Sequence, residues 1–466
     1  MSDMSDMSQR VELPQPPPPV APLAALPIAE ARDLAEEAYI FGYPLVLMDV
    51  TREVMTAAPR AGEQRAPVNQ FAHMRTFPDP SFTDVVSPNA DTLYSSAWLD
   101  VSREPIVLSL PDMSDRYYMV QMLDGWTNVF AAPGTRTTGA SAANYAITWS
   151  GWRGRLPAGM RMVATPTAMV WLIGRVRTSG AGDYAAVRTL QDRFRLTPLS
   201  AWGTPYTPPR DIPVAANVNR WEPPVDQVAR MDAMTFFSRL NTLLVTNPPA
   251  TTDAPVMERL ARIGIAPGVS MDHARLDEVV ADAMSEGMEA ARAKIAAPER
   301  AALGATQVNG WVIPLGLGRY GTDYLKRAVM AQIGLGANLP EDAVYPRATT
   351  DSDSQQLTGQ RSYTIHFDAG ELPPVNGFWS LTMYNERQFF VENPLNRYAI
   401  GERDPLRYNE DSSLDLYIQR DAPGEERMAN WLPAPEGDFS VMLRLYWPKP
   451  AVLEGEWAPP PIQRVG

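Results

Sequence analysis

The chain has 466 residues, no cysteine and a formal net charge of -13. The lack of cysteine excludes disulfides, thiolate zinc sites and a cysteine nucleophile. The acidic balance argues against nucleic acid and anionic membrane surfaces as partners, because both select basic patches. With 45% hydrophobic residues, a chain of this length is expected to bury a sizeable core and to form more than one domain.

Histidines are scarce, and none stands at a metal-ligand spacing. The chain has three, at His73, His273 and His366, without an HExxH or HxH pattern, so a zinc site would need ligands from distant segments. The sequence also contains no nucleotide-binding glycine loop with its flanking strand and lysine. We therefore predict no tightly held metal and no organic cofactor.

Residues 1–27 begin the chain with an MSD repeat and a run of prolines. This composition is typical of a disordered arm with polyproline character. The stretch lacks a basic segment followed by an apolar one, and no apolar run in the chain approaches the roughly 18 residues of a membrane-spanning helix. We expect a cytoplasmic protein as sequenced, while a periplasmic location stays open if an original leader has been replaced.

The next two segments differ in their hydrophobic period. Apolar residues recur at helical spacing at the start of 28–67, which predicts an N-terminal helical segment. Pro44 is expected to bend or break this helix, because proline lacks a backbone donor. Short apolar stretches divided by Gly, Pro and Ser turns follow over 68–224, and they predict a β-sandwich domain.

The period changes twice more toward the C-terminus. Amphipathic stretches over 225–347 predict a helical connecting segment, including one long helix over 274–303. Period-two alternation returns in SYTIHF, GFWSLTMYN, SLDLYIQ and FSVMLRLYWP, which predicts a jelly-roll-like β-sandwich over 348–466. The expected fold is thus mainly β, with a helical insert between two β domains.

Several longer motifs resemble a known family. The stretches SPNADTLYSSAWLD, RYYMVQMLDGWTNVFAAPGTRTTG, YGTDYLKRA and GANLPEDAVYP are similar to bacterial proteins that pair two domains of unknown function, numbered 1254 and 1214. The resemblance runs from Ala29 to the C-terminus. It implies an N-terminal β-sandwich-like domain, a helical connection and a C-terminal jelly-roll-like domain, and it implies no particular reaction.

The first candidate site is the stretch SPNADTLYSSAWLD, residues 87–100. One interpretation is a turn held by Asn89, because an Asn side chain can bond the backbone two residues on. The alternative is the wall of a cleft, with Asp91 and Tyr94 as catalytic residues and Asn89 and Trp98 as binding residues. Strand alternation counts against this pair, since it sends Asp91 and Tyr94 to opposite faces unless the turn ends near Thr92.

A second candidate is the hairpin in RYYMVQMLDGWTNVF, where Asp124 begins a strong turn dipeptide. Tyr118, Asp124, Trp126 and Asn128 are candidate binding residues, because ligand pockets combine apolar walls with a few polar groups. The alternative is a packed aromatic corner.

The third candidate is GRYGTDYLKRA, in which Tyr320, Tyr324 and Arg327 recur at helical spacing. Two tyrosines and an arginine on one face suit an anionic substrate. Tyrosines four residues apart are also common in simple helix packing.

Two functions are consistent with these patterns. The first is a small-molecule enzyme, a hydrolase that uses a carboxylate in an aromatic-lined cleft, because desolvation raises the pKa of such a group. The second is a non-catalytic protein that grips a ligand or another chain between its two β-sandwiches. We also expect a homo-oligomer, since the edge strands of two open sandwiches need covering.

Overall fold

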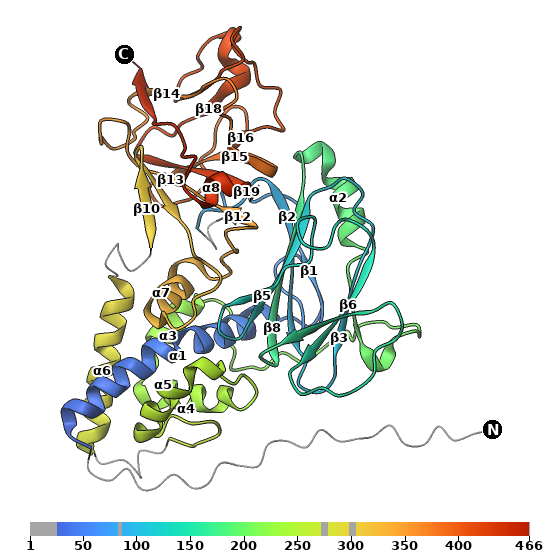
Figure 1. The fold of residues 1–466 in the computed structure, drawn as a ribbon, viewed down its shortest axis with the longest axis vertical. Helices are drawn as coiled ribbons and strands as arrows, with labels where there is room; N and C mark the ends of the chain where they lie inside the picture. Colours follow the sequence, from blue (N-terminus) through green and yellow to red (C-terminus); the bar gives the residue numbers. More distant parts are fainter. Residues whose placement is uncertain (1–25, 83–85, 272–277, 298–303, 466) are drawn as a thin grey trace.

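The computed structural model describes residues 26–82, 86–271, 278–297 and 304–465. The arm expected over 1–27 therefore lies, except for its last two residues, outside the described part. Two β-sandwiches contact each other, and a helical layer lies beside them (Figure 1). This confirms the mainly β fold with a helical insert.

The helical layer is built around α1 (Ile28–Thr56), whose buried side chains lie on every side of the helix. A helix that is apolar all round belongs inside a core. Around it pack α3 (Pro224–Ala229), α4 (Ala233–Leu244), α5 (Ala254–Leu260), α6 (Glu278–Ala296) and α7 (Tyr324–Gly334). Among the described residues, no helix is long and apolar enough to cross a lipid bilayer.

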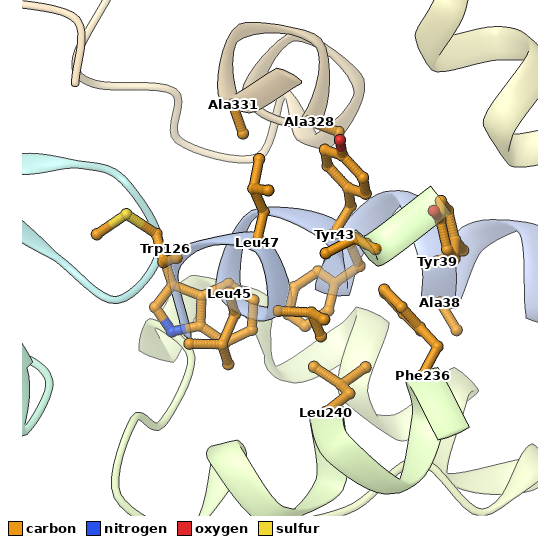
Figure 2. Packing of buried hydrophobic residues seen from close by; sticks show 14 of the residues in the cluster. Ala38, Tyr39, Tyr43, Leu45, Leu47, Trp126, Phe236, Leu240, Ala328 and Ala331 are labelled. Carbon is orange, nitrogen blue, oxygen red and sulfur yellow. The ribbon is translucent and has the colours of Figure 1, made fainter. Parts of the chain in front are cut away.

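The helix α1 does not break at Pro44. A proline inside a helix costs about 3 kcal/mol, because one hydrogen bond is lost and the ring crowds the preceding turn. Figure 2 shows what offsets this cost. Leu45 and Leu47 follow the proline, and α1 is enclosed there by α4 with Leu240 on one side and α7 with Ala331 on the other.

The N-terminal sandwich consists of an inner sheet, which faces the C-terminal domain, and an outer sheet. The inner sheet runs in the order β1 (Ala72–His73), β2 (Thr92–Asp100), β8 (Met169–Arg177), β4 (Tyr118–Asp124), β5 (Val129–Ala131). The outer sheet runs β7 (Arg161–Thr165), β6 (Ala143–Trp149), β3 (Ile106–Leu110), β9 (Arg195–Pro198), with α2 (Tyr184–Gln191) leading into β9. An apolar core lies between the two sheets.

The C-terminal sandwich has the same two-layer plan. Its inner sheet runs β10 (Ala305–Val308), β11 (Trp311–Pro314), β13 (Arg347–Ala348), β19 (Phe439–Pro448), β15 (Val375–Asn385), β16 (Ala399–Gly401), and β12 (Ala343–Val344) also pairs with β19. Its outer sheet runs β18 (Trp431–Pro433), β17 (Leu414–Gln419), β14 (Ser362–Phe367), β20 (Gln463–Val465), and the short α8 (Pro450–Leu453) follows β19. A second apolar core separates these sheets.

The segment 225–347, which the sequence predicts to be helical, also contains β10, β11 and β12. All three belong to the C-terminal inner sheet. The strands are too short to show a period, but β10 and β11 form a hairpin that carries Trp311 and Ile313 into the C-terminal core. The C-terminal sandwich thus takes residues from further upstream than 348.

Alternation along the strands turns one face of each inner sheet toward its own apolar core and the other face away from it, and the parts of the two outward faces that oppose each other carry polar residues. On β19, Leu443 and Leu445 lie in the C-terminal core, while Arg444 and Tyr446 point the other way and bond to the N-terminal domain. On β8, Val176 lies in the N-terminal core, and its neighbour Arg175 points away from it. The two polar faces therefore meet between the sandwiches.

The packing of α4 on α1 yields a stability prediction. Leu240 is fully buried, so Leu240→Ala is expected to lower the free energy of unfolding by about 2–5 kcal/mol, through lost transfer energy and a residual cavity. Urea denaturation checks this, with the exposed Ile333→Ala on α7 as a control that changes it little. Equal losses in the two variants would contradict the packing described here.

Candidate functional site

The strand register aligns polar residues on the inner face of the N-terminal sandwich. Tyr94 on β2 pairs with Arg175 on β8, and one step along the same face Ser96 pairs with Ile173, which in turn pairs with Gln121 on β4. This face is opposite to the apolar core, because residues two apart on a strand share a face. Tyr94 and Ser96 stay partly exposed.

Arg175 is 7% exposed and has no carboxylate as a hydrogen-bond or ion-pair partner among the described residues. Its Nη1 donates to the Tyr94 hydroxyl, and its guanidinium lies 4.6 Å from the centre of the Tyr94 ring. Its Nε is buried without a hydrogen-bond partner in the described structure. The edge of a guanidinium formed by Nε and one Nη can bind a carboxylate through two parallel hydrogen bonds.

Arg444 approaches the same region from the C-terminal inner sheet. Its Nη2 donates to the Ser87 carbonyl oxygen at 2.9 Å and to the Tyr384 hydroxyl at 2.5 Å. Its guanidinium lies 4.8 Å from the centre of the Tyr345 ring. The side chain is 4% exposed, and its Nε is likewise buried without a partner in the described part of the chain.

The loop after α7 joins the two faces. Gly336, at φ 88°, packs so closely on the inner sheet that an added Cβ would lie 2.9 Å from Ile173. This approach brings the Gly336 carbonyl oxygen within 2.8 Å of Gln121 Nε2. Further along, Asn338 Nδ2 donates to the Tyr345 hydroxyl at 2.8 Å. Gln121 Oε1 and Asn338 Oδ1 are buried acceptors without a donor in the described structure.

Asp91 is fully buried and ties the two domains together. Its Oδ2 accepts from Ser380 Oγ at 2.7 Å and from the Tyr446 hydroxyl at 3.2 Å. Its Oδ1 lies 2.9 Å from Arg403 Nη2 in an ion pair, although without hydrogen-bond geometry, because that nitrogen donates to the Ala90 carbonyl oxygen.

Asn89 holds the turn before β2. Its Oδ1 accepts from the backbone N–H groups of Asp91 at 2.6 Å and Thr92 at 2.9 Å. Its Nδ2 reaches across the interface to the Tyr446 hydroxyl at 2.8 Å. The turn interpretation and the domain contact therefore both apply to this residue.

The region around Arg175 and Arg444 has a surplus of positive charge. Three guanidiniums, those of Arg175, Arg403 and Arg444, stand against the single carboxylate of Asp91, which leaves two positive charges without a counter-charge among these groups. Tyrosinates do not supply it, since burial raises the pKa of Tyr345 and Tyr446 and keeps both hydroxyls protonated at neutral pH.

The other residues singled out from the sequence lie elsewhere. Trp98 stacks on Trp171 at 4.8 Å between ring centres, against the helical layer. Tyr118 belongs to the core of the N-terminal sandwich, and its hydroxyl donates to the Gly139 carbonyl oxygen at 3.0 Å. Both serve packing.

The hairpin tip and the third candidate come together as one separate cluster against α1. Asp124 Oδ1 accepts from the backbone N–H groups of Trp126 and Asn128, each at 2.9 Å. The Arg327 guanidinium is buried 5.0 Å from the Trp126 ring centre and 5.2 Å from that of Tyr324.

Two further contacts complete this cluster. The Tyr324 hydroxyl donates to Asp253 Oδ1 at 2.9 Å, and the backbone N–H of Tyr320 donates to Asn128 Oδ1 at 3.4 Å. Asp124 lies five residues along β4 from Met119, the partner of Arg175, which is roughly 16 Å at the rise of a strand. The cluster is therefore distinct from the region around Arg175.

Sequence reasoning missed Arg175, Arg444, Gln121, Asn338 and Tyr345. A signal for the two arginines is present in MVWLIGRV and VMLRLYW, where a single charge interrupts an otherwise apolar stretch. A charged residue in a strand that is buried on both faces needs a polar partner or a function. The amides and Tyr345 carry no such signal, because only the tertiary contacts bring them together.

The two described histidines lie apart from each other and have different partners. Burial lowers the pKa of His73 to about 4, and its Nδ1 lies 2.8 Å from Ser95 Oγ. His366 is bound to Asp415, 2.7 Å away, which raises its pKa. His273 lies outside the described residues. Within the described ranges, no group of three or more His, Asp or Glu side chains could hold a metal ion.

Two surface hollows lie away from the arginines. One, of about 370 Å³, is bordered by acidic residues of α1 and by the start of α7, among them Glu36, Glu37 and Asp323. The other, of about 510 Å³, lies around Phe77 and Asp79. Neither holds an unpaired buried group, so we do not assign the site to them.

The hairpin tip gives a pH prediction. Burial raises the pKa of Asp124 from 3.8 to about 6. Its contribution to stability is fully present below pH 3.8 and is lost as the pH rises through about 6, which amounts to about 3 kcal/mol. Asp124→Asn is expected to remove this loss. Urea denaturation of both proteins at pH 4 and pH 7 measures it, and a stability difference that is equal at the two pH values would contradict it.

Comparison with known proteins agrees with the two-domain plan. Residues 68–198 match the family described as Protein of unknown function (DUF1254), and residues 342–450 match Protein of unknown function (DUF1214). No curated protein matches the sequence.

Two solved structures are similar. The VPA0106 protein from Vibrio parahaemolyticus has a TM-score of 0.70 at 25% identity, covering 94% of this chain and 100% of that one. An uncharacterized protein from Burkholderia cenocepacia has a TM-score of 0.43 at 13% identity, covering 92% and 88% of the two chains. The two family models matched and their order along the chain identify it as a member of the family that carries DUF1254 followed by DUF1214, as its motifs predict.

Proposed function

We propose that the protein binds a small anionic molecule between its two inner sheets, with Arg175 and Arg444 as the groups that recognise the negative charge. The observation that carries the proposal is the pair of buried guanidiniums, each with an Nε that has no partner among the described residues and neither with a carboxylate of its own.

The physical argument concerns the cost of burial. Taking a charge out of water costs several kcal/mol unless it is paired and hydrogen-bonded. Arg175 and Arg444 are close enough to repel each other, and the nearby buried carboxylates are already paired, Asp91 with Arg403 and Asp342 with Arg136. An anion bound beside both arginines would remove this cost, so the site is suited to a ligand with negative charge.

The size of the ligand follows from the surroundings. The arginines are 7% and 4% exposed, and the partly exposed surface beside them belongs to individual side chains such as Tyr94 and Tyr345. Such a site suits a small molecule better than a segment of another chain.

The geometry favours binding over the hydrolase hypothesis. A hydrolase of the expected kind needs a carboxylate with a free oxygen, whereas both oxygens of Asp91 face fixed partners on the C-terminal sheet. Tyr94 contacts Arg175 instead of Asp91. Asp91 is better suited to holding the two domains in register.

Anion titrations test the proposal. The native protein and Arg175→Gln are titrated with acetate, succinate, citrate, sulfate and inorganic phosphate by isothermal calorimetry at low ionic strength. We expect at least one anion to bind the native protein, and Arg175→Gln to weaken it about tenfold or more, because a charge-assisted hydrogen bond is lost.

The matched control is Arg161→Gln. Arg161 also lies over a tyrosine ring, that of Tyr145 at 5.8 Å, but on the exposed edge strand of the outer sheet. Its removal should leave the affinity unchanged. If no anion binds, or if Arg175→Gln and Arg161→Gln bind as well as the native protein, the proposal is wrong.

We also propose that the chain forms a homo-oligomer. Among the described strands, β20 lies at the edge of its sheet and is exposed along its whole length, and exposed edges invite pairing. Light scattering should give a mass that is a multiple of 51.4 kDa. A mass equal to that of one chain would refute this expectation.

A further inference from the structure

The site around Arg175 holds unused acceptors as well as unused donors. Gln121 is fully buried on the same face of the inner sheet as Arg175. Its Nε2 donates to the Gly336 carbonyl oxygen at 2.8 Å. Of the two ends of the amide, only the NH2 group can donate to a carbonyl oxygen, so this contact fixes the orientation of the amide and leaves Oε1 as the atom without a partner in the described structure.

A second amide oxygen is available nearby. Asn338 is 6% exposed, stands two residues after Gly336, and has an Oδ1 without a donor among the described residues. Buried acceptors are normally satisfied, and each exception calls for a reason. Gln121 is a diagonal neighbour of Arg175 in the sheet, and Asn338 bonds Tyr345, over whose ring Arg444 lies. This combination points to a ligand that brings both negative charge and hydrogen-bond donors.

We propose that the ligand is a small hydroxylated carboxylate, an inference that rests on the anion-binding function above. Its carboxylate binds the Nε edge of Arg175, and its hydroxyl donates to Gln121 Oε1. The planar fork of a guanidinium matches a carboxylate in two parallel hydrogen bonds. A hydroxyl suits the amide oxygen because it donates without adding charge.

The spacing of the two residues fits this class. Arg175 pairs with Met119, and Gln121 lies two residues further along β4 on the same face. Diagonal neighbours of this kind stand roughly 7–8 Å apart at their Cα atoms. Their side chains can therefore bind a carboxylate and a hydroxyl that are one to three carbons apart in one small molecule.

An amine would be a poorer donor at this place. An ammonium group needs a counter-charge, and the buried carboxylates at the domain interface, those of Asp91 and Asp342, are already paired with Arg403 and Arg136. The ammonium would also meet the repulsion of Arg175 and Arg444. A hydroxy acid is therefore favoured over the matching amino acid.

The test uses ligands that differ by one group. Calorimetry compares malate, succinate and aspartate, which share two carboxylates and differ in carrying a hydroxyl, a hydrogen or an ammonium group, and it compares 3-hydroxybutyrate with butyrate. Sulfate serves as an anion without a hydroxyl donor. We expect each hydroxy acid to bind native protein at least tenfold more tightly than its partners.

A variant assigns the preference to the amide. Gln121→Met keeps the length of the side chain and removes the acceptor. It should bring the affinities for malate and succinate together by weakening malate alone, whereas Arg175→Gln should weaken both.

The outcomes separate the two proposals. If succinate or sulfate binds as tightly as malate to the native protein, the ligand class is wrong while anion binding stands. The ligand class is also wrong if neither malate nor 3-hydroxybutyrate binds better than the matching acid without a hydroxyl. If no anion binds at all, both proposals fail. The comparison on native protein decides the matter even where Gln121→Met does not fold.

Discussion

The strand alternation of the two inner sheets is the constraint on which the rest of the structure depends. Each sheet buries an apolar face inside its own sandwich, so the residues in between must point away from that core, at the other domain or, like Trp98 and Trp171, at the helical layer. On β19 the alternation places Leu443 and Leu445 in the C-terminal core and therefore places Arg444 and Tyr446 on the opposite face, toward the N-terminal domain. The polar groups then have to find partners across the interface.

Most of them do. Asp91, Ser380, Tyr446 and Arg403 form a closed set of contacts that joins the turn before β2 to the C-terminal sheet. Removing one member of a buried pair usually costs more than the pair contributes, because the other charge is left without compensation. This set fixes the register of the two domains, and its rigidity makes it unsuited to proton transfer.

The arginines nearby are different, because each keeps a buried Nε without a partner in the described structure, a feature they share with Arg327 and Arg347. Arg444 is anchored through its Nη2 on the Ser87 carbonyl oxygen, yet its Nε has no partner in the described structure. Arg175 is positioned by Tyr94 and has the same unused nitrogen. A guanidinium that is held at one edge and unused at the other is pre-organised for a ligand, since little side-chain entropy is left to lose.

Much of the fold could be predicted from the sequence, because periods of two and of 3.6 record which face is buried. The short strands β10 to β12 were not predicted, because a strand of a few residues shows no period, and the strand that β12 pairs with lies far away in the chain. Pro44 shows the opposite case, in which a strong local signal is overruled by packing around α1.

Only part of the candidate site could be predicted from the sequence. The stretch with Asn89, Asp91 and Tyr94 does lie between the domains, but alternation separates Asp91 from Tyr94 and gives each a different partner. The partners come from strands and loops about 80 to 290 residues away in sequence, and no local pattern encodes such contacts.

The most direct test of the central claim is to locate an anion between the inner sheets. Crystals of the native protein soaked in bromide at low ionic strength, and measured at the bromine absorption edge, would report the positions of bound anions by their anomalous scattering. The account predicts a peak within hydrogen-bonding distance of the Nε atoms of Arg175 or Arg444. Peaks confined to the molecular surface, with both Nε atoms bonded to ordered water, would contradict it.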